Sequence, residues 1–171
     1  MPAMQALRRL PPILAAVTLL FLAASAQIVA SGSVGAPTSF NDPHLATASA
    51  NAKIGIALPG APHFQFLWNM AGLDFDRMQR RNGGSIETGL EAWISPARRP
   101  AQSHGPLLLA DAGLGRRFGT GLHGFTAVGL GAGWSIGDWI PFVEFRRRAS
   151  FRAGRPDDRQ YLVGVKFILF G

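Results

Sequence analysis

The chain has 171 residues, a formal net charge of +7, 47% apolar residues and no cysteine. This length allows one domain with a core, and the lack of cysteine excludes disulfides and thiolate chemistry. The 21 glycines and 12 prolines argue against a helical bundle and favour many short strands joined by turns. The basic charge is compatible with nucleic-acid binding, but the N-terminal segment argues against that function.

Residues 1–26 have the features of a secretory signal. Arg8-Arg9 supply the positive start, an apolar stretch follows, and Ala24-Ser25-Ala26 matches a small-residue cleavage site. We therefore expect cleavage before Gln27 and export of the mature chain. The alternative is an uncleaved membrane anchor, although Pro11-Pro12 would interrupt a spanning helix. Because an exported protein rarely meets DNA, we expect no nucleic-acid partner.

The next segment, residues 27–50, is rich in small and turn-forming residues, and we interpret it as a flexible segment or a weak first strand. After it, residues 51–171 alternate repeatedly between apolar and polar positions, which indicates β-strands. The expected strands lie near residues 51–58, 63–78, 84–95, 106–118, 121–135, 138–152 and 159–170. These are seven strands. If they form a bacterial barrel, an even number is typical, so we expect an eighth strand before residue 50.

The segment 63–78 is the most ambiguous of these. Its apolar residues alternate as far as Met70, after which the phase shifts to Leu73. A bulge at Gly72 would explain the shift. The alternative is an amphipathic helix with Phe66, Met70 and Leu73 on one face.

The alternation in 138–152 indicates which face is inside. Val143 and Phe145 share one face, whereas Glu144 and Arg146 share the other. In the other strands too, the polar face combines glycine with charges of both signs, which suits the narrow interior of a barrel whose apolar face meets lipid. The pattern predicts an all-β, antiparallel, transmembrane up-and-down barrel of about eight strands. Mutual pairing would satisfy the enclosed charges, and a selective pore is the alternative.

We expect this charge network in the lumen: Glu87, Glu91, Asp111, Arg117, Glu144, Arg146, Arg148 and Lys166. We expect this apolar belt on the outside: Leu90, Leu114, Val128, Leu130, Val143, Phe145, Val163 and Phe167.

Two features suggest contact with membrane borders. Trp134 and Trp139 flank the short turn 136–138 and suggest an interfacial aromatic girdle, although two core tryptophans of a soluble fold would also fit. Arg80 and Arg81 lie in a polar loop expected on the outer side, where arginine can bind the phosphates of lipopolysaccharide. Simple solvated loop charge is the alternative for these two arginines.

Over most of residues 51–171, this pattern resembles the small eight-stranded outer-membrane proteins of the OmpA and OmpX class. The best local match is the ending "QYLVGVKFILFG", an amphipathic strand with the aromatic Phe170 next to last. The resemblance implies a location in the bacterial outer membrane, in contact with the lipid bilayer and lipopolysaccharide. It also implies insertion by the outer-membrane assembly machinery, which reads such terminal strands.

Some small outer-membrane barrels modify lipid A, and the deacylase kind has a histidine, a serine two residues later and a glutamate. Here Phe125 follows His123 at that spacing, and Ser135 lies about 40 Å farther along the same strand. Glu144 is the nearest candidate carboxylate, but Ser135 is too distant to act with His123. No metal-ligand spacing involves the remaining histidines, His44, His63 and His104. We therefore predict no catalytic residue, no metal and no cofactor.

The function predicted from these patterns is that of a non-enzymatic outer-membrane barrel with a structural or surface-binding role. Two alternatives are kept. One is a lipid A-modifying barrel enzyme of the deacylase kind, and the other is a soluble exported β-barrel that binds a small apolar ligand.

Overall fold

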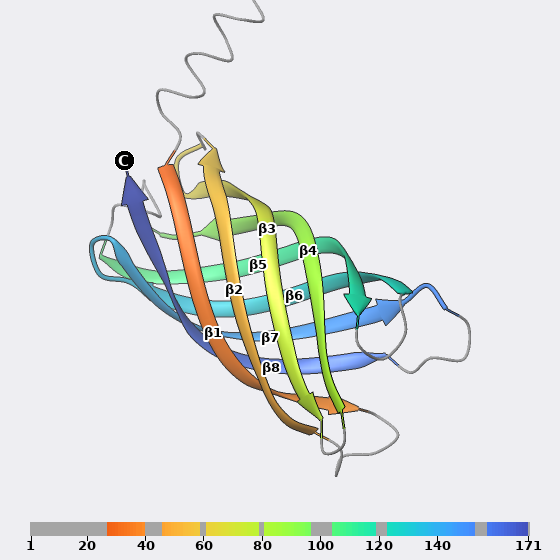
Figure 1. The fold of residues 1–171 in the computed structure, drawn as a ribbon. Coiled ribbons are helices and arrows are strands. Elements are labelled where there is room, and N and C mark those ends of the chain that lie inside the picture. Colours follow the sequence, from red (N-terminus) through yellow and green to blue (C-terminus); the bar gives the residue numbers. More distant parts are fainter. Residues whose placement is uncertain are drawn as a thin grey trace, which may run out of the picture.

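The computed structural model describes residues 27–39, 46–58, 61–78, 81–96, 104–118, 123–152 and 157–170. The expected secretory signal at 1–26 lies outside these residues. The described residues form mostly β-strands (Figure 1). The strands are β1 (Gln27–Ser39), β2 (Ala46–Leu58), β3 (Phe64–Met78), β4 (Arg81–Ile94), β5 (Gly105–Phe118), β6 (His123–Ser135), β7 (Trp139–Ser150) and β8 (Asp158–Phe170).

Each strand pairs with the next one in the chain, and β8 pairs with β1, so the sheet closes into a barrel. All of these pairings are antiparallel; across the closing seam, Val34 of β1 lies opposite Val163 of β8. The start of β1 and the end of β8 lie at the same end of the barrel (Figure 1). The predicted antiparallel up-and-down barrel is confirmed. Among the described residues, no helix is long and apolar enough to cross a membrane.

The additional strand expected before residue 50 is present. It is β1, at residues 27–39, and β2 begins at Ala46 rather than near residue 51. Of the two interpretations of residues 27–50, a first strand therefore holds for 27–39, and a flexible segment does not hold for the described residues. Its outward positions are small, such as Ala30, Gly32 and Ala50, so the contrast between the two faces is weak in the sequence although the strands are complete.

Residues 64–78 form the long strand β3, so the helical alternative is wrong. Against β4, the register shifts between Asn69 and Gly72, and a shift occurs on the β2 side as well. The extra residues of this bulge, Met70 and Ala71, lie beside the predicted position. In a regular strand, residues five positions apart lie on opposite faces. Because the bulge shifts which residues face inward, Asn69 and Asp74 are nevertheless both buried.

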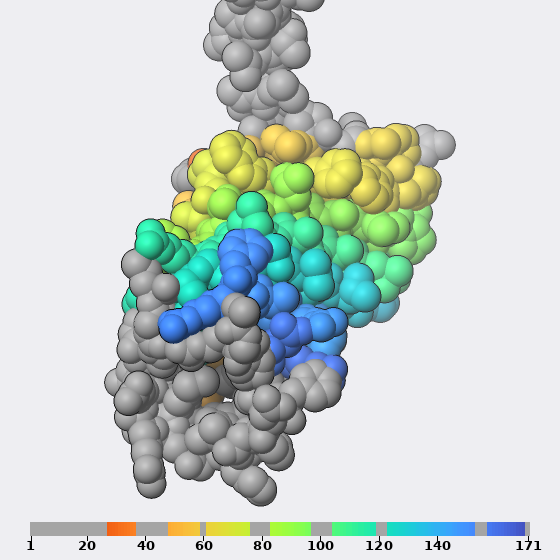
Figure 2. Space-filling model, turned by 90° about the vertical axis from the view of Figure 1, so that its right-hand side faces the viewer, coloured from red at the N-terminus to blue at the C-terminus, as the bar shows by residue number. Residues whose placement is uncertain are grey.

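The two faces of the barrel wall differ in chemistry. Along β7, burial alternates from residue to residue between Trp139 and Arg148. Val143 is 54% exposed, whereas Arg146, on the other face, is 2% exposed. Figure 2 views the wall from the side, where the strands follow one another in chain order from yellow to blue. Many large apolar side chains lie on this outer wall, whereas many polar and charged side chains are enclosed.

The predicted apolar belt is exposed except at one position. Leu90, Leu114, Val128, Leu130, Val143, Phe145 and Val163 are exposed large side chains. Phe167 is only half-buried rather than fully exposed. The ring of Trp139 packs edge-on against it with a centroid distance of 4.6 Å, which covers part of its surface.

Candidate functional site: the lumen and the outer borders

The lumen has an apolar end and a charged remainder. The apolar end lies near the termini, where one buried cluster combines residues from the start of odd strands and the end of even strands. The cluster consists of Val29, Ala57, Leu67, Trp93, Leu107, Leu109, Ile140, Phe142 and Ile168. These packed side chains fill that end of the barrel, as expected for a barrel of eight strands.

Glu91 and Lys166 join the apolar cluster to the charged region. Lys166 Nζ lies 2.9 Å from Glu91 Oε1, and both side chains are 1% exposed. Trp93 Nε1 donates a hydrogen bond of 2.6 Å to the same oxygen. The Lys166 ammonium also lies 4.2 Å from the ring centroid of Phe142. Each enclosed charge thus has an opposite charge or a polarised partner, as burial requires.

Arg146 occupies the middle of the lumen and connects carboxylates from three strands. Its Nη1 donates to Glu87 Oε1 at 2.6 Å, and its Nη2 donates to Asp111 Oδ2 at 3.1 Å. Glu144 Oε1 is farther away, 3.9 Å from Nε. Lys53 Nζ adds a contact of 3.5 Å to Glu87. The planar guanidinium suits this role, because it presents several donors in fixed directions.

Gly129 leaves room for this central group. It lies opposite Asp111 on β5 and opposite Arg146 on β7. A Cβ atom at this position would collide with Asp111 Oδ1 and would lie 2.9 Å from Glu144 Oε1. The absence of a side chain here therefore allows two carboxylates to enter the same layer of the lumen.

Arg148 organises the end of the lumen away from the termini. Its guanidinium forms ion pairs with Asp74 and Asp158, and it contacts Ser85 Oγ at 3.3 Å. Gln160 Nε2 donates to Asp74 Oδ2 at 3.0 Å. Arg117 Nη1 lies 3.4 Å from Asp158 Oδ2. Asp158 therefore connects Arg117 to Arg148.

The structure places all the predicted lumen charges on the inner side of the wall. Most of them are buried, and Arg117 is half-buried. Sequence analysis missed Lys53, Asp74 and Asp158. The alternation of Asn51 and Lys53 with small and apolar residues could have identified Lys53. By contrast, the bulge hides the phase of Asp74, and Asp158 lies one residue before the strand expected at 159–170.

The two predicted girdle tryptophans lie on the outside at the termini end of the barrel. Trp134 is 54% exposed and Trp139 is 58% exposed. The turn between them contains Gly137 with a φ of 62°, a conformation that favours glycine. Arg80 lies outside the described residues, and Arg81 is described only as the first residue of β4.

The candidate catalytic residues do not come together. His123 and Ser135 are the first and last residues of the same strand, β6. Glu144 belongs to the enclosed group around Arg146. His63 and His104 are exposed near strand ends, and His44 lies outside the described residues. Across the residues that the structure describes, no three histidine or carboxylate side chains form a group that could hold a metal ion.

Several solved structures are similar to this chain. The chain is similar to Neisserial surface protein A, with a TM-score of 0.54 and 11% identity over 84% of this chain and 97% of that one. It is also similar to the outer membrane enzyme PagL, with a TM-score of 0.57 and 13% identity over 81% and 98% of the two chains. For Ail of Yersinia pestis, the TM-score is 0.44 and the identity 7%, over 83% and 96%.

No protein-family model and no curated protein sequence matches the chain. At such low identity, the structural likeness concerns the fold alone. The fold is that of the small, eight-stranded outer-membrane β-barrels.

Proposed function

We propose that the protein is a non-enzymatic outer-membrane β-barrel with a structural or surface-binding role. The observation that carries this proposal is the inverted distribution of side chains. Leu130 and Val163 are 69% and 60% exposed, whereas Arg146 and Lys166 are 2% and 1% exposed. A large apolar belt is unfavourable in water and favourable in the hydrocarbon of a bilayer.

The same proposal orients the barrel. Residues 1–26 would act as a cleaved secretory signal, and both ends of the mature chain would face the periplasm. The apolar cluster would then lie at the periplasmic end, and the group around Arg148 would lie toward the cell surface. The assembly machinery would read β8, and the bilayer and lipopolysaccharide would surround the wall.

The filled lumen supports a structural or binding role rather than a pore. Trp93 and Arg146 lie in the interior and are almost fully buried. A channel would need these side chains to move and would break the contacts of Arg146 with Glu87 and Asp111. We therefore expect no stable ion conductance in planar bilayers.

Cell fractionation tests the location. We expect the mature protein in the outer-membrane fraction, and we expect its band on SDS gels to shift only after boiling, because a closed barrel keeps its ladder hydrogen bonds in detergent. Release by osmotic shock alone, without a heat-dependent shift, would contradict the proposal and favour the soluble exported barrel.

Mass spectrometry of lipid A tests the enzymatic alternative. Phe125, two residues after His123, is 3% exposed and occupies the inner face. A serine nucleophile is therefore missing at the spacing found in the deacylase kind. We expect the purified, folded barrel to leave the acyl chains of lipid A intact. Release of a fatty acid by the folded protein would overturn the non-enzymatic assignment.

A further inference from the structure

A polar and aromatic ridge runs along the outer face of β7 and β8. Arg147 lies opposite Arg159, and Phe145 lies opposite Tyr161. The two rings are 5.2 Å apart between centroids. The Arg147 side chain is 55% exposed, and Asp157 binds its Nε and Nη2 atoms. Among the described residues, Nη1 of Arg147 has no hydrogen-bond partner, so this guanidinium still has N–H groups that can donate to an anion.

The ridge begins at the depth of a lipid headgroup. Trp139 marks the termini end of β7, and Arg147 lies eight residues farther along the same strand. This separation corresponds to about 26 Å along a strand and to roughly 20 Å across a membrane at the usual tilt of such strands. An apolar band of an outer-membrane barrel is about 25 Å tall. If Trp139 lies at one border, Arg147 therefore lies close to the other.

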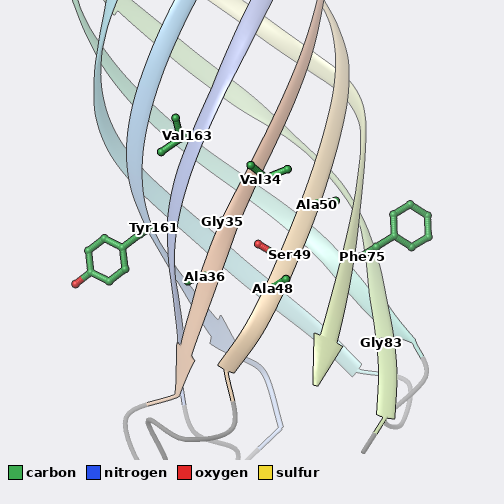
Figure 3. A pocket seen from close by; sticks show the side chains of 10 residues that line it. All are labelled: Val34, Gly35, Ala36, Ala48, Ser49, Ala50, Phe75, Gly83, Tyr161 and Val163. Carbon is green, nitrogen blue, oxygen red and sulfur yellow. The ribbon is translucent and has the colours of Figure 1, made fainter. Parts of the chain in front are cut away.

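An apolar groove lies on one side of the ridge. It covers the outer face of β1 and β2 and has a volume of about 790 Å³. Figure 3 shows the ring of Tyr161 at one side and that of Phe75 at the other, with Val34, Ala36 and Ala48 between them. The small side chains create the depression, and the rings form its walls. Tyr161 is thus both part of the ridge and a wall of this groove.

A second, smaller hollow lies on the other side of the ridge, over β5 and β6. Its volume is about 390 Å³, and its lining includes Val128, Leu130, Phe145 and Arg147. Gly129, which has no side chain, contributes to its floor. The ridge therefore carries guanidinium groups at its outer end and has an apolar depression along each flank.

We propose that this face is a binding site for the phosphorylated, multiply acylated glucosamine anchor of lipopolysaccharide. A phosphate would lie against Arg147 and Arg159, because guanidinium binds phosphate with strong, directional hydrogen bonds. Acyl chains would run down the two depressions, one on each side of the Phe145–Tyr161 pair. A lipid with a phosphate at its headgroup and several acyl chains below it matches this surface, because the guanidinium groups lie at the outer end of the ridge and an apolar depression lies on each side of it.

This site rests on the proposed outer-membrane location and orientation, which direct the Arg147 end of the barrel toward the outer leaflet. Other outward arginines lie at the same end, since Arg116 and Arg152 are exposed there, whereas the turn at the termini end presents Asp138. The basic end of the wall would thus meet the leaflet that carries lipopolysaccharide phosphates.

The test reconstitutes the purified, folded protein in phosphatidylcholine nanodiscs and measures the binding of three probes. The probes are diphosphoryl lipid A, its dephosphorylated form, and phosphatidylglycerol. We expect diphosphoryl lipid A to bind at least about tenfold more tightly than the other two, since the loss of charge-assisted contacts has effects of this size.

Two variants and two matched controls assign the binding to this face. R147Q/R159Q should weaken diphosphoryl lipid A binding about tenfold or more, whereas Arg152→Gln should not. Ala48→Phe fills the larger groove and should also weaken binding. Ile54→Phe adds a similar ring to an outward position of β2 that does not line the groove. A heat-dependent gel shift establishes that each variant is folded.

The outcomes separate this inference from the proposed function. If the wild-type protein fractionates with the outer membrane but all folded variants bind diphosphoryl lipid A equally, the site is wrong and the location stands. Equal binding of phosphatidylglycerol and diphosphoryl lipid A would replace the lipopolysaccharide anchor by a general anionic lipid. If the wild-type protein is released by osmotic shock, the location fails first, and the site fails with it.

Discussion

The inner and outer faces of the barrel wall carry opposite chemistries, and consecutive residues of β7 show the difference. Arg146 is 2% exposed and binds Glu87 and Asp111 inside the lumen. The next residue, Arg147, has a side chain that is 55% exposed and pairs with Asp157 outside. The same side-chain type therefore meets two different environments within one residue step. In a water-soluble protein, the enclosed face would be the apolar one.

The lumen also differs along its length. Near the termini, apolar residues such as Leu107 and Ile140 pack together, whereas charged groups fill the space beyond Lys166. Apolar packing can close one end without directional partners, but the charged part must satisfy each group. We therefore expect substitutions in the charged part to be sensitive to the chemistry of the new side chain as well as to its size.

The largest expected effect comes from breaking the contrast between Arg146 and Arg147. Arg146→Leu leaves Glu87 and Asp111 enclosed without their main partner, which should cost about 3–5 kcal/mol of unfolding free energy. Arg147→Leu removes an exposed pair and should cost about 0.5 kcal/mol or less in a membrane without lipopolysaccharide. Urea-unfolding midpoints in phosphatidylcholine vesicles measure both. Equal losses, or a greater loss from Arg147→Leu, would mean that the two faces are assigned wrongly.

A charge placed on the outer face tests the lipid environment. Leu130 is 69% exposed on the outer wall, four residues from Trp134 along β6. Leu130→Arg should cost about 2–4 kcal/mol in vesicles, as for arginine at lipid-facing positions near the midplane of other barrels. Ile136→Arg, in the turn at the membrane border, should cost about 0–1 kcal/mol. A neutral effect of Leu130→Arg is the result expected for a surface in water, and it would contradict the account.

Two tryptophans provide a matched comparison of the inner and outer faces. Trp93 is 0% exposed and donates to Glu91, whereas Trp134 is 54% exposed. Trp93→Phe removes a hydrogen bond to an enclosed charged group, and we expect a loss of about 1.5–3 kcal/mol. Trp134→Phe should change the free energy by about 0.5 kcal/mol or less. Unfolding midpoints in the same vesicles measure both variants. A greater loss of stability from Trp134→Phe than from Trp93→Phe would contradict the enclosed network.

The smallest expected effect concerns the space at Gly129. Gly129→Ala pushes a methyl group toward Asp111 Oδ1 and Glu144 Oε1, and we expect a loss of about 1–3 kcal/mol because the carboxylates can shift only in part. The control is Gly32→Ala, since a Cβ atom at Gly32 would meet no heavy atom within 4 Å. Thermal or urea unfolding of both variants measures the difference. Equal stabilities would show that the centre of the lumen is looser than these contacts imply.

The barrel fold and the orientation of its two faces could be predicted from the sequence, because apolar and polar residues alternate with period two along most strands. The apolar and polar positions of 139–152 alone identified the sides of Val143 and Arg146. Where small residues occupy the outer positions, as in β1, the alternation loses contrast, and the sequence did not establish a complete strand. The bulge at Met70 then reversed the phase and concealed Asp74.

The pairings within the lumen required the structure. Arg146 meets Glu87 from β4 and Asp111 from β5, neither of which is a neighbour of β7 in the chain. Such contacts depend on barrel closure and on how the strands are staggered, which local periodicity does not encode. The same is true of Lys166 and Glu91, which lie 75 residues apart. The positions of the β7–β8 ridge and of the apolar depressions on its two sides likewise depend on cross-strand register.

Fluorescence quenching by brominated lipids tests the central claim, that the apolar face contacts lipid and the charged face is enclosed. One variant keeps only Trp68, which is 46% exposed on the outer wall, and another keeps only Trp93, which is 0% exposed; phenylalanine replaces the other tryptophans. In vesicles with bromine along the acyl chains, we predict strong quenching of Trp68 and little quenching of Trp93. Strong quenching of Trp93 with an unquenched Trp68 would contradict the account.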